Sequence, residues 1–293
     1  MLNIRNRLSL NPRINNLMKN LFLVFIAGSF LTNCQSETSA QENIQSTPET
    51  TSTVTTLQSE LALVWSDEFD ATTLNLDNWT YELGDGCPNL CGWGNSELQE
   101  YTEDNHRLED GMLIISAQKI STSNYTSTRI ITKGKKEFQY GRIEARVKVP
   151  SGAGMWPAFW ALGNDIETNS WPNCGEIDII EYVGKNPGQI FTSVHTASSY
   201  GNTINTQITP TPNVEDDFHV YSIEWNKDFI EFFFDDSRVY RYAPQIQNNE
   251  TWPFNKPFFF ILNLAVGGNF GGPVANNIEF PREFIIDYVR VYQ

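Results

Sequence analysis

Short runs in which apolar and polar residues alternate recur along the chain from about residue 61 to its C-terminal end. One such run sets Ile143, Ala145 and Val147 against charged neighbours, which is the two-residue period of a β-strand with one buried face. Turn-forming residues, such as Glu109-Asp110-Gly111, separate the runs. The pattern predicts strands at residues 61–65, 97–101, 112–118, 140–149, 156–162, 176–182, 190–195, 219–225, 229–235, 258–265 and 285–292.

These strands decide the expected fold class. Residues 60–293 show no long stretch with the 3.6-residue period of a helix, and nothing resembling a linker divides them. About 230 residues suffice for one large all-β domain. We therefore expect a single all-β domain at residues 60–293, built as a two-sheet antiparallel sandwich.

The N-terminal region is organised as an export signal. In residues 1–33, a basic segment without acidic residues precedes an apolar core that is too short to span a bilayer permanently. Leu31-Thr32-Asn33-Cys34 resembles a bacterial lipobox, which implies cleavage before Cys34, lipidation of its thiol and an outer-membrane lipoprotein. Ordinary secretion with cleavage elsewhere is the alternative. Residues 34–59 are rich in Ser, Thr, Gln and Glu, so we expect a disordered tether.

The charge of the chain restricts its partners. The sequence holds 20 basic and 35 acidic residues. Without the four basic residues of the export signal, 16 basic and 35 acidic residues remain, which gives a net charge of −19. Such a charge repels nucleic acids, anionic membranes and sulfated or carboxylated polymers at long range, whereas a neutral polymer is not repelled. We therefore expect a neutral polymer as the partner, no nucleic acid, and membrane contact through the lipid anchor alone. Nothing in the sequence indicates an oligomer, so we expect a monomer.

The most informative stretch is residues 175–184, where three acidic residues interrupt an apolar, β-branched run. Alternate side chains of a strand share a face, so Glu176 and Asp178 point the same way, but Glu181 would face the core of a regular strand. One extra residue at Ile179-Ile180, a β-bulge, would return Glu181 to the face of the other two acids. We predict a bulged strand that presents three carboxylates to one cleft.

Such a row of carboxylates suits glycoside hydrolysis with retention, in which two groups roughly 5–5.5 Å apart act as nucleophile and as acid/base. The flexible side chains of Glu176 and Glu181 could close to that distance. We assign Glu176 as nucleophile and Glu181 as general acid. Asp178 would hydrogen-bond Glu176 and, through its charge, keep Glu181 protonated. The alternative is a solvated acidic face without chemistry.

The cysteines offer no obvious catalytic metal site. Cys87 and Cys91 lie in a glycine-rich loop and could form a local disulfide in an oxidising compartment, which would leave Cys174 as an unpaired thiol beside the acidic strand. A zinc site is the alternative, but the three histidines of the chain show no ligand spacing.

Aromatic residues could complete a sugar-binding surface. Trp156 and Trp160 share one face of their predicted strand, with Ala158 between them, and would form a flat platform for sugar rings. Core packing is the alternative for each ring, but eight tryptophans, all outside the export signal, exceed what one core needs. Trp93 and Asn95 add a ring and an amide on a glycine-rich loop.

Three further polar residues are candidates for the same surface: Arg129, His195 and Asn263. His195 ends the strand after the acidic one, so antiparallel pairing could bring it beside Glu181. A purely structural imidazole is equally compatible with the sequence. Asn263 interrupts a strongly apolar strand and needs a partner, which could itself be structural.

Taken together, these residues resemble glycoside hydrolase family 16, and specifically its laminarinase-like members. The resemblance covers nearly all of residues 61–293. It rests on Trp65-Ser66-Asp67-Glu68-Phe69, Gly94-Asn95-Ser96-Glu97-Leu98-Gln99, Gly141-Arg142-Ile143-Glu144-Ala145-Arg146, Trp156-Pro157-Ala158-Phe159-Trp160, Gly175-Glu176-Ile177-Asp178-Ile179-Ile180-Glu181, Leu262-Asn263-Leu264-Ala265-Val266-Gly267-Gly268 and Asp287-Tyr288-Val289-Arg290-Val291-Tyr292.

The resemblance implies a β-jelly-roll sandwich with an open cleft on its concave face and endo-acting, retaining hydrolysis of laminarin-type β-1,3-glucan. It implies the same roles for the three acids, in the bulged form that laminarinases share with agarases and carrageenases. It implies no cofactor for catalysis. It also implies a structural calcium ion, held by Glu68, the carbonyl of Gly111, and Asp287.

A non-catalytic, lipid-tethered protein that captures glycan for a transporter is the alternative of a different class. The presence of both Glu176 and Glu181 argues for the enzyme, because binding alone does not require two facing acids. Among enzymes, activity on mixed-linkage glucan, agar or carrageenan is the alternative, and the negative charge of the chain argues against carrageenan.

Overall fold

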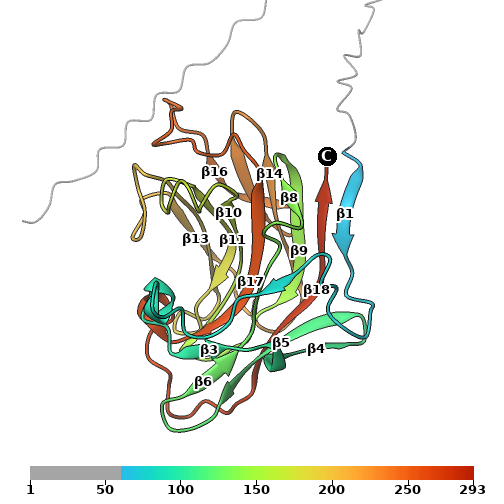
Figure 1. Cartoon of the computed structure of the whole chain (residues 1–293), viewed down its shortest axis with the longest axis vertical. Coiled ribbons are helices and arrows are strands. Elements are labelled where there is room, and N and C mark those ends of the chain that lie inside the picture. The colour runs from blue at the N-terminus through green and yellow to red at the C-terminus, as the bar shows by residue number, and fades with distance from the viewer. Residues whose placement is uncertain (1–60) are drawn as a thin grey trace, which may run out of the picture. The chain divides into compact units, whose positions relative to one another are not determined.

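The computed structural model describes residues 61–293, which form two β-sheets with few helical turns (Figure 1). The predicted signal peptide (1–33), Cys34 and the predicted tether (34–59) lie outside the described residues. Within the described part, no helix is both long and apolar enough to cross a membrane.

The first sheet, sheet A, has ten strands. Its order is β16 (Ser237–Tyr242), β15 (Ile230–Phe234), β14 (His219–Trp225), β9 (Gly141–Lys148), β18 (Arg282–Tyr292), β5 (Met112–Lys119), β6 (Tyr125–Ser127) and β3 (Gln99–Tyr101), with β1 (Leu63–Asp67) paired to β18 and β4 (His106–Glu109) paired to β5. In Figure 1, blue β1 runs beside red β18, so the two ends of the described chain lie together.

The second sheet, sheet B, has eight strands and carries the acidic segment. Its order is β13 (Thr206–Pro210), β12 (Gln189–His195), β11 (Glu176–Tyr182), β10 (Met155–Gly163), β17 (Phe258–Val266), β7 (Arg129–Ile131) and β2 (Thr80–Tyr81), with β8 (Glu137–Phe138) paired to β17. The helical turns are η1 (Cys91–Gly94), η2 (Glu103–Asn105) and α1 (Gly268–Gly271). This is the predicted all-β sandwich. One pair among the described strands, β3 with β6, is parallel rather than antiparallel.

Each of the eleven predicted strands overlaps an observed one. Seven strands were not predicted: β2, β4, β6, β7, β8, β13 and β16. They are two to six residues long, and most are too short for an alternating pattern to repeat. The turn at Asp110-Gly111 joins β4 to β5 with both residues at positive φ, as a two-residue hairpin loop requires.

The hydrophobic core fills the space between the sheets. Ile143, Ala145 and Val147, the apolar set of β9, are at most 1% exposed, so the alternation in the sequence does mark the inner face of sheet A. All nine residues of β17 are buried. On its second face, Phe259 and Ile261 pack with Ile131, Leu162 and Cys174 in a small apolar cluster. Asn263 is the one polar residue of this strand, and it is buried with the other eight.

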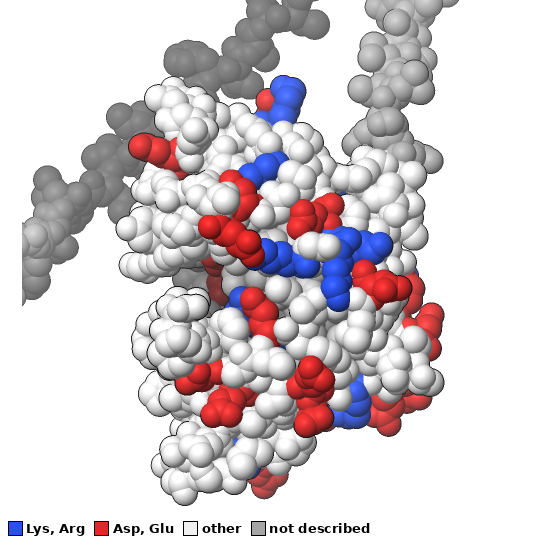
Figure 2. Space-filling view, viewed as in Figure 1, with Lys and Arg blue, Asp and Glu red and all other residues white. Residues whose placement is uncertain are grey.

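The outer face of sheet A is solvated and charged. Arg142 pairs with Glu144, Arg146 with Asp287, and Glu231 with two arginines. Figure 2 shows acidic and basic side chains intermixed over one view of the domain. Glu144 and Glu231 are each 7% exposed, so their arginine partners cover them. The candidate chemistry lies on the other sheet.

Candidate active site

Strand β11 contains the predicted bulge. Phe159 of β10 pairs with Ile180, but its neighbour Trp160 pairs with Asp178, so Ile179 has no partner on β10. The register between β11 and β12 shifts at the same place. Ile179 and Ile180 are each 1% exposed and belong to the core, which is why the chain accommodates an extra residue here.

The bulge places three carboxylates on one face of sheet B. Their partners on β10 are spaced two residues apart and so share a face: Leu162 opposite Glu176, Trp160 opposite Asp178 and Ala158 opposite Glu181. Asp178 is 2% exposed, whereas Glu176 and Glu181 are partly exposed. The central acid is therefore buried between two acids that solvent can reach.

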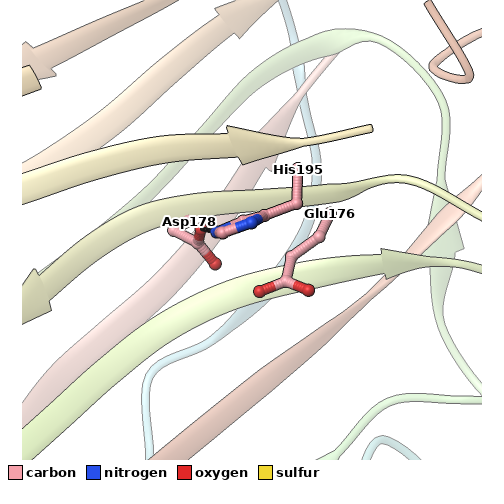
Figure 3. Close-up of side chains that lie close together, drawn as sticks. All are labelled: Glu176, Asp178 and His195. Atoms are coloured by element: carbon pink, nitrogen blue, oxygen red, sulfur yellow. Dashed lines mark ion pairs between the residues drawn. The ribbon is translucent and has the colours of Figure 1, made fainter. Parts of the chain in front are cut away.

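His195 lies opposite Glu176, not beside Glu181 as the sequence predicted. In an antiparallel pair, the end of β12 meets the beginning of β11, where Glu176 is. The imidazole Nε2 lies 3.1 Å from Asp178 Oδ2, and the three side chains converge in Figure 3. The backbone N–H of Gly201 donates to Nδ1 at 3.1 Å, so the neutral ring carries its proton on Nε2, facing Asp178.

Glu176, Asp178 and His195 could in principle hold a metal ion, because one ligand atom from each lies within 4.8 Å of the others. The tautomer of His195 argues against it. A metal-binding histidine donates its second N–H to an acceptor, whereas here that nitrogen accepts from the N–H of Gly201. The nitrogen that faces the carboxylates is thus the protonated one, and we interpret the cluster as an acid–imidazole group without a metal.

Burial raises the pKa of all three carboxyl groups. Burial and the neighbouring Asp178 raise the pKa of Glu176 to about 8. Burial, opposed by His195 and by the hydrogen bond from Trp156, raises the pKa of Glu181 to about 7. The pKa of Asp178 lies well above its usual range, first through burial and then through the charge of Glu181. The contact between the two carboxyl groups also raises the pKa of Glu176 and lowers that of Asp178.

Each outer carboxylate accepts a hydrogen bond from a tryptophan. Trp156 Nε1 donates to Glu181 Oε1 at 2.9 Å, and Trp171 Nε1 donates to Glu176 Oε2. Trp171 is 41% exposed and packs edge-on against the exposed ring of Tyr200. Neither Trp171 nor Tyr200 was predicted from the sequence. Trp171 stands five residues before Glu176, but no strand pattern marks its loop.

Trp160 lies on the same face and is tied to neighbouring strands. Its Nε1 donates to Asn263 Oδ1 at 2.7 Å, and Asn263 Nδ2 donates to the hydroxyl of Tyr101 at 3.0 Å. Asn263 is 5% exposed, so its partners are structural. The guanidinium of Arg129 lies between the rings of Trp93 and Trp160, with its carbon 4.5 Å and 4.9 Å from the two ring centres.

A disulfide between Cys87 and Cys91 lies just before Trp93 and Asn95 in the same loop region. Trp93 is half-buried and its Nε1 donates to the carbonyl of Gly84. Asn95 is exposed and its Nδ2 donates to the carboxylate of Glu97. Both residues therefore lie at the edge of the surface formed by Trp160. Cys174, by contrast, is a fully buried free thiol.

The predicted calcium ligands lie away from this face. Both carboxylate oxygens of Glu68 accept hydrogen bonds from Arg290, and Asp287 Oδ2 lies 2.6 Å from the guanidinium of Arg146. Gly111 stands at the hairpin turn with φ of 72°. With both oxygens of Glu68 already bonded to a cation, these residues as they lie do not fit a calcium ion.

Comparisons with known proteins agree with this geometry. A model of the glycosyl hydrolases family 16 matches residues 95–288. The chain is 43% identical over 248 residues to a β-glucanase from Rhodothermus marinus, a match that covers 79% of this chain and 85% of that protein. It is 38% identical to glucan endo-1,3-β-glucosidase A1 of Niallia circulans, over 79% of this chain but 38% of that longer protein. Among solved structures, a laminarinase from Flavobacterium sp. UMI-01 superposes with a TM-score of 0.77 and 56% identity, over 79% of this chain and 100% of that one.

Proposed function

Because the chain belongs to the glycosyl hydrolases of family 16, we propose that it is an endo-β-1,3-glucanase that cleaves laminarin-type β-glucan. The observation that carries the proposal is the row Glu176, Asp178 and Glu181 on one face of sheet B, bordered by exposed and half-buried aromatic rings. A neutral glucan suits the negative charge of the chain, and the Rhodothermus marinus and Flavobacterium relatives are named as a β-glucanase and a laminarinase.

We propose that hydrolysis retains the configuration of the anomeric carbon. Glu176 attacks that carbon while Glu181 gives its proton to the departing glycosidic oxygen, which leaves a covalent bond between sugar and Glu176. Glu181, now a carboxylate, then takes a proton from water. The water attacks the same carbon and frees Glu176. A pKa of about 7 keeps Glu181 partly protonated at neutral pH, as the first step requires.

Glu176 must be ionised to act as the nucleophile, and we propose that Asp178 keeps it so. A pKa of about 8 would leave Glu176 mostly protonated by itself. Asp178 is the more deeply buried of the two, and burial favours its neutral form. A proton held by Asp178 and donated to Glu176 leaves Glu176 ionised for attack. Nε2 of His195 lies 3.1 Å from Asp178 Oδ2, so the imidazole packs against this carboxyl group.

The experiment that tests this function is digestion of laminarin, lichenan, agarose and κ-carrageenan, with product size followed over time. We expect a rapid fall in laminarin chain length. Replacing Glu181 by Gln should lower kcat by about 10²–10⁴. Glu109→Gln, at an exposed site on sheet A, is the matched control and should leave kcat unchanged. Tight binding without new reducing ends on any substrate would show a glycan-capturing protein instead.

The stereochemistry has its own measurement. Proton NMR of a fresh digest resolves α and β anomers before mutarotation mixes them. The retaining mechanism predicts that the β anomer appears first. Early appearance of the α anomer would show direct attack by water and remove the nucleophilic role of Glu176.

We also propose that the chain is exported and anchored by lipidation of Cys34, and that it acts as a monomer. The support is the order of basic, apolar and lipobox-like segments in residues 1–34. Labelling with a radioactive fatty acid should mark the wild-type chain and spare Cys34→Ser. Light scattering of the chain without its anchor should give the mass of one copy.

A structural calcium ion remains a prediction of the family resemblance, and no catalytic step depends on it. Binding would require Glu68 to exchange Arg290 for the metal. A rise in Tm on adding Ca²⁺ after EDTA treatment, abolished in Glu68→Gln, would show that this exchange occurs.

A further inference from the structure

We propose that Glu97 is a positioning residue that sets the geometry of the glucan-binding face, an inference that rests on the proposed function. Glu97 lies in the loop between η1 and β3. Among residues 61–293, it forms no hydrogen bond with Glu176 or Glu181. Its Oε2 accepts hydrogen bonds from Gln99 Nε2 at 2.7 Å and from the hydroxyl of Tyr101 at 3.2 Å. Its Oε1 accepts one from Asn95 Nδ2 at 3.3 Å.

A relay of buried groups connects Glu97 to Trp160. The hydroxyl of Tyr101 donates to Glu97 and accepts from Asn263 Nδ2, and Asn263 Oδ1 accepts from Trp160 Nε1. Tyr101 is 1% and Asn263 5% exposed, so water cannot replace any link without loss. A tyrosine hydroxyl, which both donates and accepts, is what such a link needs. The orientation of the Trp160 ring therefore depends on the carboxylate of Glu97.

Two further contacts extend the influence of Glu97. Its charge attracts Arg129, whose guanidinium separates the rings of Trp93 and Trp160 and whose Nε forms an ion pair with Glu82 Oε2 at 2.5 Å. Its partner Gln99 accepts a hydrogen bond from the backbone N–H of Val266 at 2.7 Å, which ties the loop to β17. Burial raises the pKa of Glu97.

Four residues assigned to sugar binding thus converge on one carboxylate: Asn95 directly, Arg129 through charge, Asn263 through Tyr101, and Trp160 through Asn263. These four residues are therefore held as one group and do not contact the sugar independently of one another. The side-chain hydrogen bonds to Glu176 and Glu181 come from Trp171 and Trp156, which are not members of this group. Loss of the group should therefore weaken glucan binding and leave the chemical step nearly intact.

The test is Tyr101→Phe, which removes a single hydroxyl and cuts the relay on both sides. The amide of Asn263 loses its acceptor, and Glu97 loses a donor. We expect KM for laminarin to rise about 5- to 20-fold with kcat within about two-fold of wild type. Glu97→Leu, which also removes the contacts with Asn95 and Gln99, should raise KM at least as much as Tyr101→Phe. Glu97→Gln, which keeps an acceptor for Tyr101 but loses the charge facing Arg129, should recover part of the affinity. Tyr240→Phe, at a half-buried tyrosine of β16 in sheet A, is the matched control and should leave both constants unchanged.

A merely structural role would lower Tm and leave KM unchanged at a temperature where the variant is folded. That result, or a fall in kcat at unchanged KM, would overturn the proposal. Binding of laminari-oligosaccharides, followed by tryptophan fluorescence, separates this proposal from the proposed function. A wild-type chain that binds without cleaving would refute the glucanase, and a weaker Kd in Tyr101→Phe would still support the relay. An unchanged Kd would overturn the relay alone, and a wild-type chain that neither cleaves nor binds would overturn both.

Discussion

Replacing Trp156 by Phe should move the alkaline limb of the pH–activity profile upward. The indole Nε1–H donates to Glu181 Oε1 at 2.9 Å and favours the charged form of that carboxyl group, so it lowers a pKa that burial has raised to about 7. Phenylalanine keeps an aromatic ring but cannot donate. The pKa of Glu181 should therefore rise further, and the general acid should stay protonated at higher pH.

The magnitude follows from the geometry of that bond. A hydrogen bond to a charged group contributes about 1.5–3 kcal/mol, and one pKa unit corresponds to about 1.4 kcal/mol. Since Glu181 is partly exposed, water recovers some of the loss. We therefore expect the alkaline limb of kcat/KM to move up by roughly one pH unit.

The assay is the initial rate of reducing-end release from laminarin between pH 4 and 10, with kcat/KM fitted at each pH. Trp160→Phe is the matched control, because Trp160 Nε1 donates to the neutral amide of Asn263. That variant should lose affinity at every pH without moving the limb. A limb that stays in place in Trp156→Phe, or moves downward, would refute the assignment of Glu181 as the proton donor held by Trp156.

Three further predictions use other groups of the same face. Trp171→Phe removes the donor to Glu176 and should raise the pKa of Glu176, so the acidic limb of the profile should move up and kcat measured at pH values below the optimum should fall. Glu176→Gln should unfold at a higher Tm than wild type at pH 8 and at nearly the same Tm at pH 4.5, by differential scanning calorimetry. The reason is that the pKa of Glu176 is raised from 4.5 to about 8 in the native state. Between these pH values the native state binds more protons than the unfolded state, so the stability of the wild type falls as pH rises. Cys174, whose pKa burial raises to about 12, should resist alkylation at pH 8 until the protein unfolds, and modification of its peptide in the native state, seen by mass spectrometry, would contradict the buried position.

The sequence by itself determined the features that depend on neighbouring residues. Alternation predicted the long strands, because a strand with one buried face needs an apolar residue at every second position. It also predicted the bulge of β11, since Glu181 cannot share a face with Glu176 and Asp178 without one extra residue in the strand. The three carboxylates follow directly from that local rule.

Only the tertiary structure decided which residues meet across the sheet. Asn263 and Tyr101 are 162 residues apart in the chain, and no periodicity within either strand indicates that they bond. His195 was expected beside Glu181 and lies opposite Glu176, because the pairing register is set by the whole sheet. Trp171 and Glu97 reach the site from loops, whose backbone follows no repeating pattern that a sequence could display. A strand's period is local, whereas the partners of a polar group are chosen by long-range packing, so the acids could be read from the sequence and the residues that orient them could not.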